Sequence, residues 1–179
     1  LADGGKGDDD LLQGLGANDR LKGDTGDDRL EGGINDDTLF GGGQADTLLG
    51  EEGDDRLFGG IGRDELLGGL GNDRLEGEGG DDTLLGGEGE DTIFGDGGDD
   101  TASGGEGHDR IFGGVGDDEL RGDERADRLE GQGGDDLLLG GDWDDTIFGG
   151  SGADVIRANA DHDRAYGGTE DDWIRGGGG

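Results

Sequence analysis

Hydrophobic residues recur along this chain with a period of nine. Each lies two residues after an aspartate, and its neighbours are polar or of mixed character. The series begins Leu11, Leu21, Leu30, Leu39 and passes through Ile93, Ala102 and Ile111 to Ala165 and Ile174. Successive side chains of an extended segment point to opposite faces, so one aliphatic side chain per period faces inward. The pattern predicts one short strand in every nine residues.

The aspartates define the same period. We place the first at Asp9, ten residues before Asp19, which requires one inserted residue between them. Glycine stands five residues before nearly every aspartate, with Ala158 as the exception. The repeating unit is G-G-x-G-x-D-x-apolar-x, and it occurs nineteen times.

Two such units are expected to close one coil of 18 residues. The first six residues of a unit predict a turn, because glycine permits left-handed backbone angles, and the last three predict a minimal strand. About ten coils, stacked about 4.8 Å apart, would form a rod roughly 50 Å long. Turns then stack in two columns. The Asp28 column holds Asp9, Asp28, Asp46, Asp64, Asp82, Asp100, Asp118, Asp136, Asp154 and Asp172. The Asp19 column holds Asp19, Asp37, Asp55, Asp73, Asp91, Asp109, Asp127, Asp145 and Asp163.

Composition shows that this rod needs more than a hydrophobic core. The 179 residues include 50 Gly, 49 Asp plus Glu and only 14 Lys plus Arg, with a net charge of -35. Chains this acidic and this poor in apolar residues are usually disordered. Two buried aliphatic side chains per coil contribute about 2 kcal/mol each. Even with backbone hydrogen bonds at roughly 1 kcal/mol each, the sum falls short of ordering 18 residues at about 1.5 kcal/mol each.

Calcium supplies the missing contribution. It takes six to eight oxygen ligands and tolerates irregular geometry, and the turns offer backbone carbonyls beside carboxylates. One ion between each pair of successive turns in a column gives nine plus eight gaps, hence at most about 17 ions. Their charge of about +34 nearly cancels the chain's -35. The predicted ligands are the aspartates of both columns together with turn glycines. These glycines are Gly53, Gly60, Gly62, Gly69, Gly71, Gly80, Gly87, Gly89, Gly98, Gly105, Gly107, Gly114, Gly116, Gly134, Gly150 and Gly152.

Residues 59–67 (GGIGRDELL) and 113–121 (GGVGDDELR) match the unit at every position. The chain thereby resembles the repeat-in-toxin, hemolysin-type calcium-binding family, whose signature is this nonapeptide. The resemblance implies an all-β parallel β-roll, a two-sheet right-handed β-solenoid with calcium between its turns. It also implies a single domain over 1–179, a fragment of a longer secreted or cell-surface bacterial protein. Such domains occur in toxins, proteases, lipases and adhesins that leave the cell by type I secretion and fold outside it.

The fourth position of the unit departs from glycine in seven units. The substitutions are Ala17, Asn35, Gln44, Arg125, Trp143, Asp161 and Glu170. Arg125, Trp143 and Asp161 are 18 residues apart and stack in the Asp19 column. Bulky residues are costly where a positive φ is needed, so we expect weak or absent calcium there. The Asp19 column should be filled only near Gly53, Gly71, Gly89 and Gly107, and the Asp28 column should be nearly complete.

Two rows of side chains on one face of the rod have open interpretations. An aromatic row consists of Phe40, Phe58, Phe94, Phe112, Phe148 and Tyr166. It either docks a partner domain or stacks on itself to shield the strands. An arginine row consists of Arg20, Arg56, Arg74, Arg110, Arg128 and Arg164. It either binds an anionic polysaccharide or pairs with neighbouring glutamates such as Glu76 and Glu130.

Other functions find little support in the sequence. The absence of cysteine excludes disulfides and thiolate metal sites, and no apolar stretch is long enough to span a membrane. The negative charge disfavours nucleic acid as a partner. His108 and His162 stand in no catalytic motif, so we expect no enzyme activity. Ice binding is disfavoured because the outward positions lack a regular array of Thr and Asn. A structural spacer, or an acidic segment that adheres to a surface or mineral, remains an alternative. Flanking domains and end-to-end homo-oligomers are possible partners, since a solenoid normally needs caps.

Overall fold

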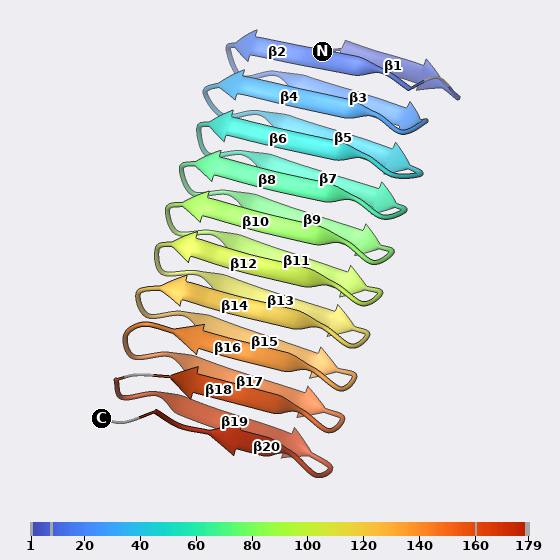
Figure 1. The fold of residues 1–179 in the computed structure, drawn as a ribbon. Coiled ribbons are helices and arrows are strands. Elements are labelled where there is room, and N and C mark those ends of the chain that lie inside the picture. Colours follow the sequence, from blue (N-terminus) through green and yellow to red (C-terminus); the bar gives the residue numbers. More distant parts are fainter. Residues whose placement is uncertain (1, 8, 160, 178–179) are drawn as a thin grey trace.

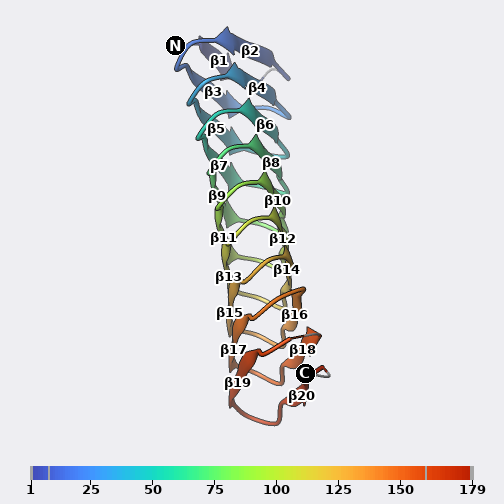
Figure 2. The same ribbon diagram turned by 90° about the vertical axis from the view of Figure 1, so that its left-hand side faces the viewer.

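The chain forms a rod of two facing parallel sheets, each of ten strands (Figure 1). The computed structural model describes residues 2–7, 9–159 and 161–177, and these contain strands and turns but no helix. Accordingly, the described part has no helix that could cross a membrane. Successive strands alternate between the sheets, so odd-numbered strands form one sheet and even-numbered strands form the other. The side view shows the two layers along the whole rod (Figure 2).

The strand bounds follow the nonapeptide. They are β1 Ala2–Lys6, β2 Leu11–Gly16, β3 Arg20–Thr25, β4 Arg29–Ile34, β5 Thr38–Gly43, β6 Thr47–Glu52, β7 Arg56–Ile61, β8 Glu65–Leu70, β9 Arg74–Gly79, β10 Thr83–Glu88, β11 Thr92–Gly97, β12 Thr101–Glu106, β13 Arg110–Val115, β14 Glu119–Glu124, β15 Arg128–Gly133, β16 Leu137–Gly141, β17 Thr146–Ser151, β18 Val155–Asn159, β19 Arg164–Thr169 and β20 Trp173–Arg175. Most strands therefore have six residues, twice the predicted three. Each runs on through the first three positions of the next unit, because those residues still pair with the neighbouring coil, as in Gly42↔Gly60 and Gly43↔Ile61. In the six-residue strands only the fourth to sixth positions of the unit lie outside the strands, whereas β16 ends one residue earlier, at Gly141.

The core is the predicted column of single aliphatic side chains between the sheets. Residues 18 apart lie opposite each other, as Leu39 and Leu57 do in β5 and β7. These side chains are almost fully buried from Leu21 to Ile156. Ala165 is only partly buried, and Ile174 in the last strand is 45% exposed.

The predicted register of the first unit is wrong. Leu12 is 7% exposed and belongs to the core, whereas Leu11 is 62% exposed. The N–H of Arg29 donates to the carbonyl of Asp10, as the N–H of Thr38 does to that of Asp19. Asp10 is nine residues before Asp19, so no residue is inserted between them. The extra residue lies before Asp10, because Lys6 pairs with Thr25, 19 residues on, whereas the N–H of Asp10 donates to Asp28, 18 residues on.

The outer face of the odd-numbered sheet carries the aromatic row as three stacked pairs. Phe40 and Phe58 have ring centroids 4.9 Å apart, Phe94 and Phe112 also 4.9 Å, and Phe148 and Tyr166 5.0 Å. Arg20, Arg74 and Arg128 each lie over the first ring of a pair. The predicted ion pairs also form, with 2.6 Å from Arg74 to Glu76 and from Arg128 to Glu130. The aromatic and arginine rows therefore make extensive contacts within the rod itself.

Candidate metal centre

Each repeat places one aspartate at the end of a turn, directly before a strand. Its Oδ1 atom accepts a hydrogen bond from the backbone N–H of the aspartate 18 residues earlier. Asp82 N donates to Asp100 Oδ1 at 2.8 Å, and Asp100 N donates to Asp118 Oδ1 at 2.8 Å. The same bond recurs in both columns, from Asp10 N to Asp28 Oδ1 down to Asp154 N to Asp172 Oδ1. The ladder fixes every carboxylate in one orientation, pointing inside the turn.

The second carboxylate oxygen of sixteen of these aspartates has no hydrogen-bond partner. Sixteen Oδ2 atoms are buried without a hydrogen bond in the described part of the chain. They belong to Asp10, Asp28, Asp37, Asp46, Asp55, Asp64, Asp73, Asp82, Asp91, Asp100, Asp109, Asp118, Asp127, Asp136, Asp145 and Asp154. Buried polar atoms are normally paired, and an unpaired buried charge is far more costly than an unpaired neutral group. Repetition of the same unpaired oxygen along both edges indicates a ligand that recurs with the coil.

Carbonyl oxygens face the same space as these free oxygens. A methyl group placed on Gly95 would lie 2.3 Å from Asp100 Oδ2 and 2.5 Å from the carbonyl oxygen of Gly113. On Gly59 the corresponding distances are 2.6 Å to Asp64 Oδ2 and 2.9 Å to the Gly77 carbonyl. Glycine at the first position of the unit therefore keeps open a small space lined by carboxylate and carbonyl oxygen.

The glycines predicted as ligands form two further rows of carbonyls. A methyl group on Gly60, at the second position, would lie 2.1 Å from the carbonyl oxygen of Gly42 in the preceding coil. On Gly71, at the fourth position, it would lie 2.0 Å from that of Gly53. These carbonyls thus point along the rod towards the next turn. The first-position glycine carbonyls were missed by the sequence analysis, which treated that glycine only as part of the turn.

Burial raises the pKa values of the inner carboxyl groups, as three of them illustrate. Burial raises the pKa of Asp100 to about 7, although the N–H of Asp82 opposes the shift, and the neighbouring Asp82 and Asp118 carboxylates add to it. Burial likewise raises the pKa of Asp73 to about 7 and that of Asp127 to about 8. A cation beside Oδ2 would lower these pKa values again, because an opposite charge favours the ionised form.

A second row of carboxylates lies outside the first. Fifth-position aspartates accept from the next coil rather than the preceding one, as Asp99 Oδ1 does from Asp117 N at 2.9 Å. Asp9 belongs to this outer row, because it is exposed and its Oδ1 accepts from Asp27 N at 3.1 Å. The predicted position of Asp9 in the ligand column is therefore wrong, and Asp10 takes its place in the ladder. The doublet Asp9-Asp10 follows the Asp27-Asp28 pattern, which was the signal available in the sequence.

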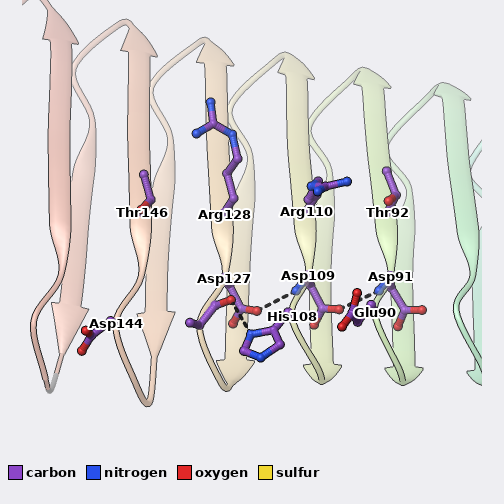
Figure 3. A pocket seen from close by; sticks show the side chains of 11 residues that line it. Glu90, Asp91, Thr92, His108, Asp109, Arg110, Asp127, Arg128, Asp144 and Thr146 are labelled. Carbon is purple, nitrogen blue, oxygen red and sulfur yellow. Dashed lines mark hydrogen bonds between the residues drawn. The ribbon is translucent and has the colours of Figure 1, made fainter.

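A shallow groove follows the turns of the Asp19 column (Figure 3). Asp91, Asp109 and Asp127 line it in a row, joined by their N–H to carboxylate bonds. The His108 ring lies at its outer rim, with Nδ1 2.9 Å from the carbonyl oxygen of Ala126. In the described residues, no three acidic or imidazole side chains converge on one point, so a metal in these turns draws on backbone oxygens as well.

The donor set fits calcium. It consists of carboxylate and carbonyl oxygens, which are the ligands of a hard cation, with no nitrogen or sulfur donor among them. One carboxylate oxygen is far below the six to eight ligands that calcium takes, so carbonyl oxygens of two stacked turns are needed to complete the set.

Comparison with known families gives the same result over nearly the whole chain. No curated protein matches the sequence. The family model described as RTX calcium-binding nonapeptide repeat (4 copies) matches eleven overlapping segments, which are 3–39, 13–48, 31–66, 58–93, 67–102, 85–120, 94–129, 112–147, 121–156, 140–173 and 157–179. Since these segments leave no gap between residues 3 and 179, the chain belongs to the RTX calcium-binding nonapeptide repeat family.

Proposed function

We propose that this chain is a calcium-induced folding module of a secreted protein and has no catalytic activity of its own. The observation that carries the proposal is the set of sixteen buried Oδ2 atoms without a partner. Without a cation these carboxylates oppose folding through desolvation and mutual repulsion. With calcium they become ligands, and the same atoms then hold successive coils together.

Such a dependence suits a protein that crosses a membrane before it folds. Calcium is scarce in the cytosol and abundant outside the cell, so the chain remains extended during export and becomes a rod on arrival. We therefore assign it to the extracellular space or the cell surface, attached to domains that carry the activity of the whole protein. The two columns contain at most about 17 inter-turn gaps, nine in one and eight in the other.

Far-UV circular dichroism during a calcium titration, with magnesium as control, tests this function. Calcium should convert a coil spectrum into a β spectrum. Magnesium should not, because it demands near-ideal octahedral geometry and retains its water ligands. A chain that stays disordered in millimolar calcium, or one that is fully folded in chelator, would contradict the proposal.

A further inference from the structure

Most turns fall into two backbone classes, according to the residue at the fourth position; Gly7, Ala17 and Gly107 do not follow this division. Ten glycines at this position have φ between 121° and 150°. They are Gly26, Gly53, Gly62, Gly71, Gly80, Gly89, Gly98, Gly116, Gly134 and Gly152. Six substituted residues have φ between 74° and 85°, in the left-handed helical region that non-glycine residues can enter. They are Asn35, Gln44, Arg125, Trp143, Asp161 and Glu170. A single turn of the second class still directs its carbonyl at the next turn, because a methyl group on Gly62 would lie 1.8 Å from the carbonyl oxygen of Gln44.

Three successive turns of the second class occur in only one place, at Arg125, Trp143 and Asp161. In the same column, the N–H groups of Gly53, Gly71 and Gly89 donate to a carbonyl in the next coil at 2.7–2.9 Å, and Gly107 does so at 3.3 Å. Among the described residues of this column, Arg125 does not make this bond to Asp142. The Trp143 N–H donates to the Asp161 carboxylate at 3.1 Å.

The opposite edge of the same coils is regular. There Gly98, Gly116 and Gly134 each donate to the next coil at 2.9 Å. An isolated substitution is also tolerated, because Gln44 donates to Ile61 at 2.7 Å. Asn35, which follows Ala17 in the Asp19 column, does not donate to Glu52 in the described structure, so the irregularity accompanies successive substituted turns of one column and not substitution as such.

Strand pairing is shorter by one residue at the start of this stack. The pairing of β12 with β14 extends to Glu106↔Glu124. The pairing of β14 with β16 stops one residue earlier, at Asp123↔Gly141, although the N–H of Asp142 still donates to the carbonyl of Asp123 at 2.9 Å. On the other sheet the full length is kept, through Val115↔Gly133 and Gly133↔Ser151.

The inner carboxylates nevertheless continue unchanged through this segment. The N–H of Asp109 donates to Asp127 Oδ1 at 2.8 Å, and that of Asp127 to Asp145 Oδ1 at 2.9 Å. The Oδ2 atoms of Asp127 and Asp145 are buried and unpaired like all the others. The segment thus keeps the charged ligand of each site, whereas its turns take the second backbone class three times in succession and Arg125 lacks the backbone hydrogen bond made by the glycines above it.

We propose that the three gaps Gly107–Arg125, Arg125–Trp143 and Trp143–Asp161 form a second, weaker class of calcium site that fills after the rest of the rod. The proposal rests on calcium binding as the proposed function. Calcium then loads the rod in two phases. The first completes the Asp28 column and the middle of the Asp19 column, and the second closes one edge at residues 123–163.

Trp143 is a local reporter of the second phase, because it lies in the stack and is 63% exposed. The only other tryptophan is Trp173, so a Trp173→Phe variant leaves a single emitter. In a calcium titration of this variant, the change in Trp143 fluorescence should occur at a several-fold higher calcium concentration than the circular-dichroism transition. Coincident curves would overturn the proposal but leave calcium-induced folding intact. Absence of both transitions would instead remove the proposed function.

Ion counting by equilibrium dialysis provides the complementary test. The triple variant Arg125→Gly, Trp143→Gly, Asp161→Gly should bind up to three more calcium ions than the parent at the end of the first phase. The reciprocal control is Gly134→Asn in the regular column, which introduces the second backbone class as an isolated turn. It should still fold and keep its ion count within one of the parent. An unchanged count in the triple variant, with folding preserved, would contradict the two-class assignment.

Discussion

The interior and the edges of this rod differ in whether their buried groups have partners within the protein. Between the sheets, one leucine or isoleucine per half-coil is buried against its copies above and below and needs nothing further. At the edges, equally buried carboxylates each keep an oxygen without a partner. The interior therefore sets the 18-residue register, whereas the edges decide whether the register is stable. On the proposed function, the fold is encoded by the protein alone, whereas its stability depends on a bound ligand.

Acidification should stabilise the folded chain in the absence of calcium, and this is the largest effect that we expect. Burial raises the pKa of Asp136 to about 7 and that of Asp118 to about 6, from an ordinary value of 3.8. The folded chain therefore binds more protons than the unfolded chain between these values, so its stability falls as pH rises. The contribution is fully present below about pH 4 and is lost by about pH 8.

Circular dichroism of the chain in chelator, from pH 8 down to pH 4, measures this effect. β-structure should appear on acidification. Its appearance should depend less on pH in variants that carry Asp→Asn at several inner positions. Loss of β-structure on acidification would show that the edges do not behave as buried carboxylates. Calcium affinity should change in the opposite sense and rise with pH over the same range, because calcium competes with the protons.

Removal of a single inner carboxylate should come next in magnitude. Asp100→Ala takes a ligand from the gaps on both sides of its turn, and we expect calcium affinity there to fall by about tenfold or more, roughly 1.4 kcal/mol per site. The matched control is Asp99→Ala, which removes an exposed outer carboxylate that accepts only the Asp117 N–H. A calcium titration in which the two variants coincide would contradict the distinction between inner and outer rows.

Much of this division between interior and edges could be predicted from the sequence. The period, the single inward aliphatic residue and the turn aspartates all follow from residue spacing, because identical units can only stack. The six-residue length of the strands could not be predicted. The second- and third-position residues have the composition of a turn, and only their pairing with the next coil shows that they belong to the strands. The first register was misplaced because Asp9 and Asp10 are chemically identical. Their roles differ only through the 18-residue ladder.

A cavity in the interior should cost less than loss of calcium from the edges as a whole. Leu84→Ala, calcium-loaded, should lower the free energy of unfolding by about 2–5 kcal/mol. The residue lies opposite Ala102, which already provides little volume. The control Leu85→Ala changes the next residue, which is 38% exposed, and should cost about 0.5 kcal/mol or less. Equal losses in thermal or urea unfolding would contradict the assignment of the core.

The smallest effect should come from the outer aromatic pairs. Phe94→Leu removes the stacking with Phe112 and the contact with Arg74, and should cost about 0.5–1.5 kcal/mol. Phe112→Tyr keeps a stacked pair of the kind seen at Phe148 and Tyr166 and should be close to neutral. A larger loss in Phe112→Tyr than in Phe94→Leu, measured in the same calcium buffer, would contradict a stacking role.

Small-angle X-ray scattering with and without calcium tests the central claim most directly, because it measures the shape of the whole chain. In chelator at neutral pH, an unfolded chain of 179 residues should have a radius of gyration of about 45 Å. Saturating calcium should reduce it to roughly 16–20 Å, the range of a compact chain of this length allowing for its elongation. A chain in chelator that already has the small radius, and does not change when calcium is added, would contradict the account.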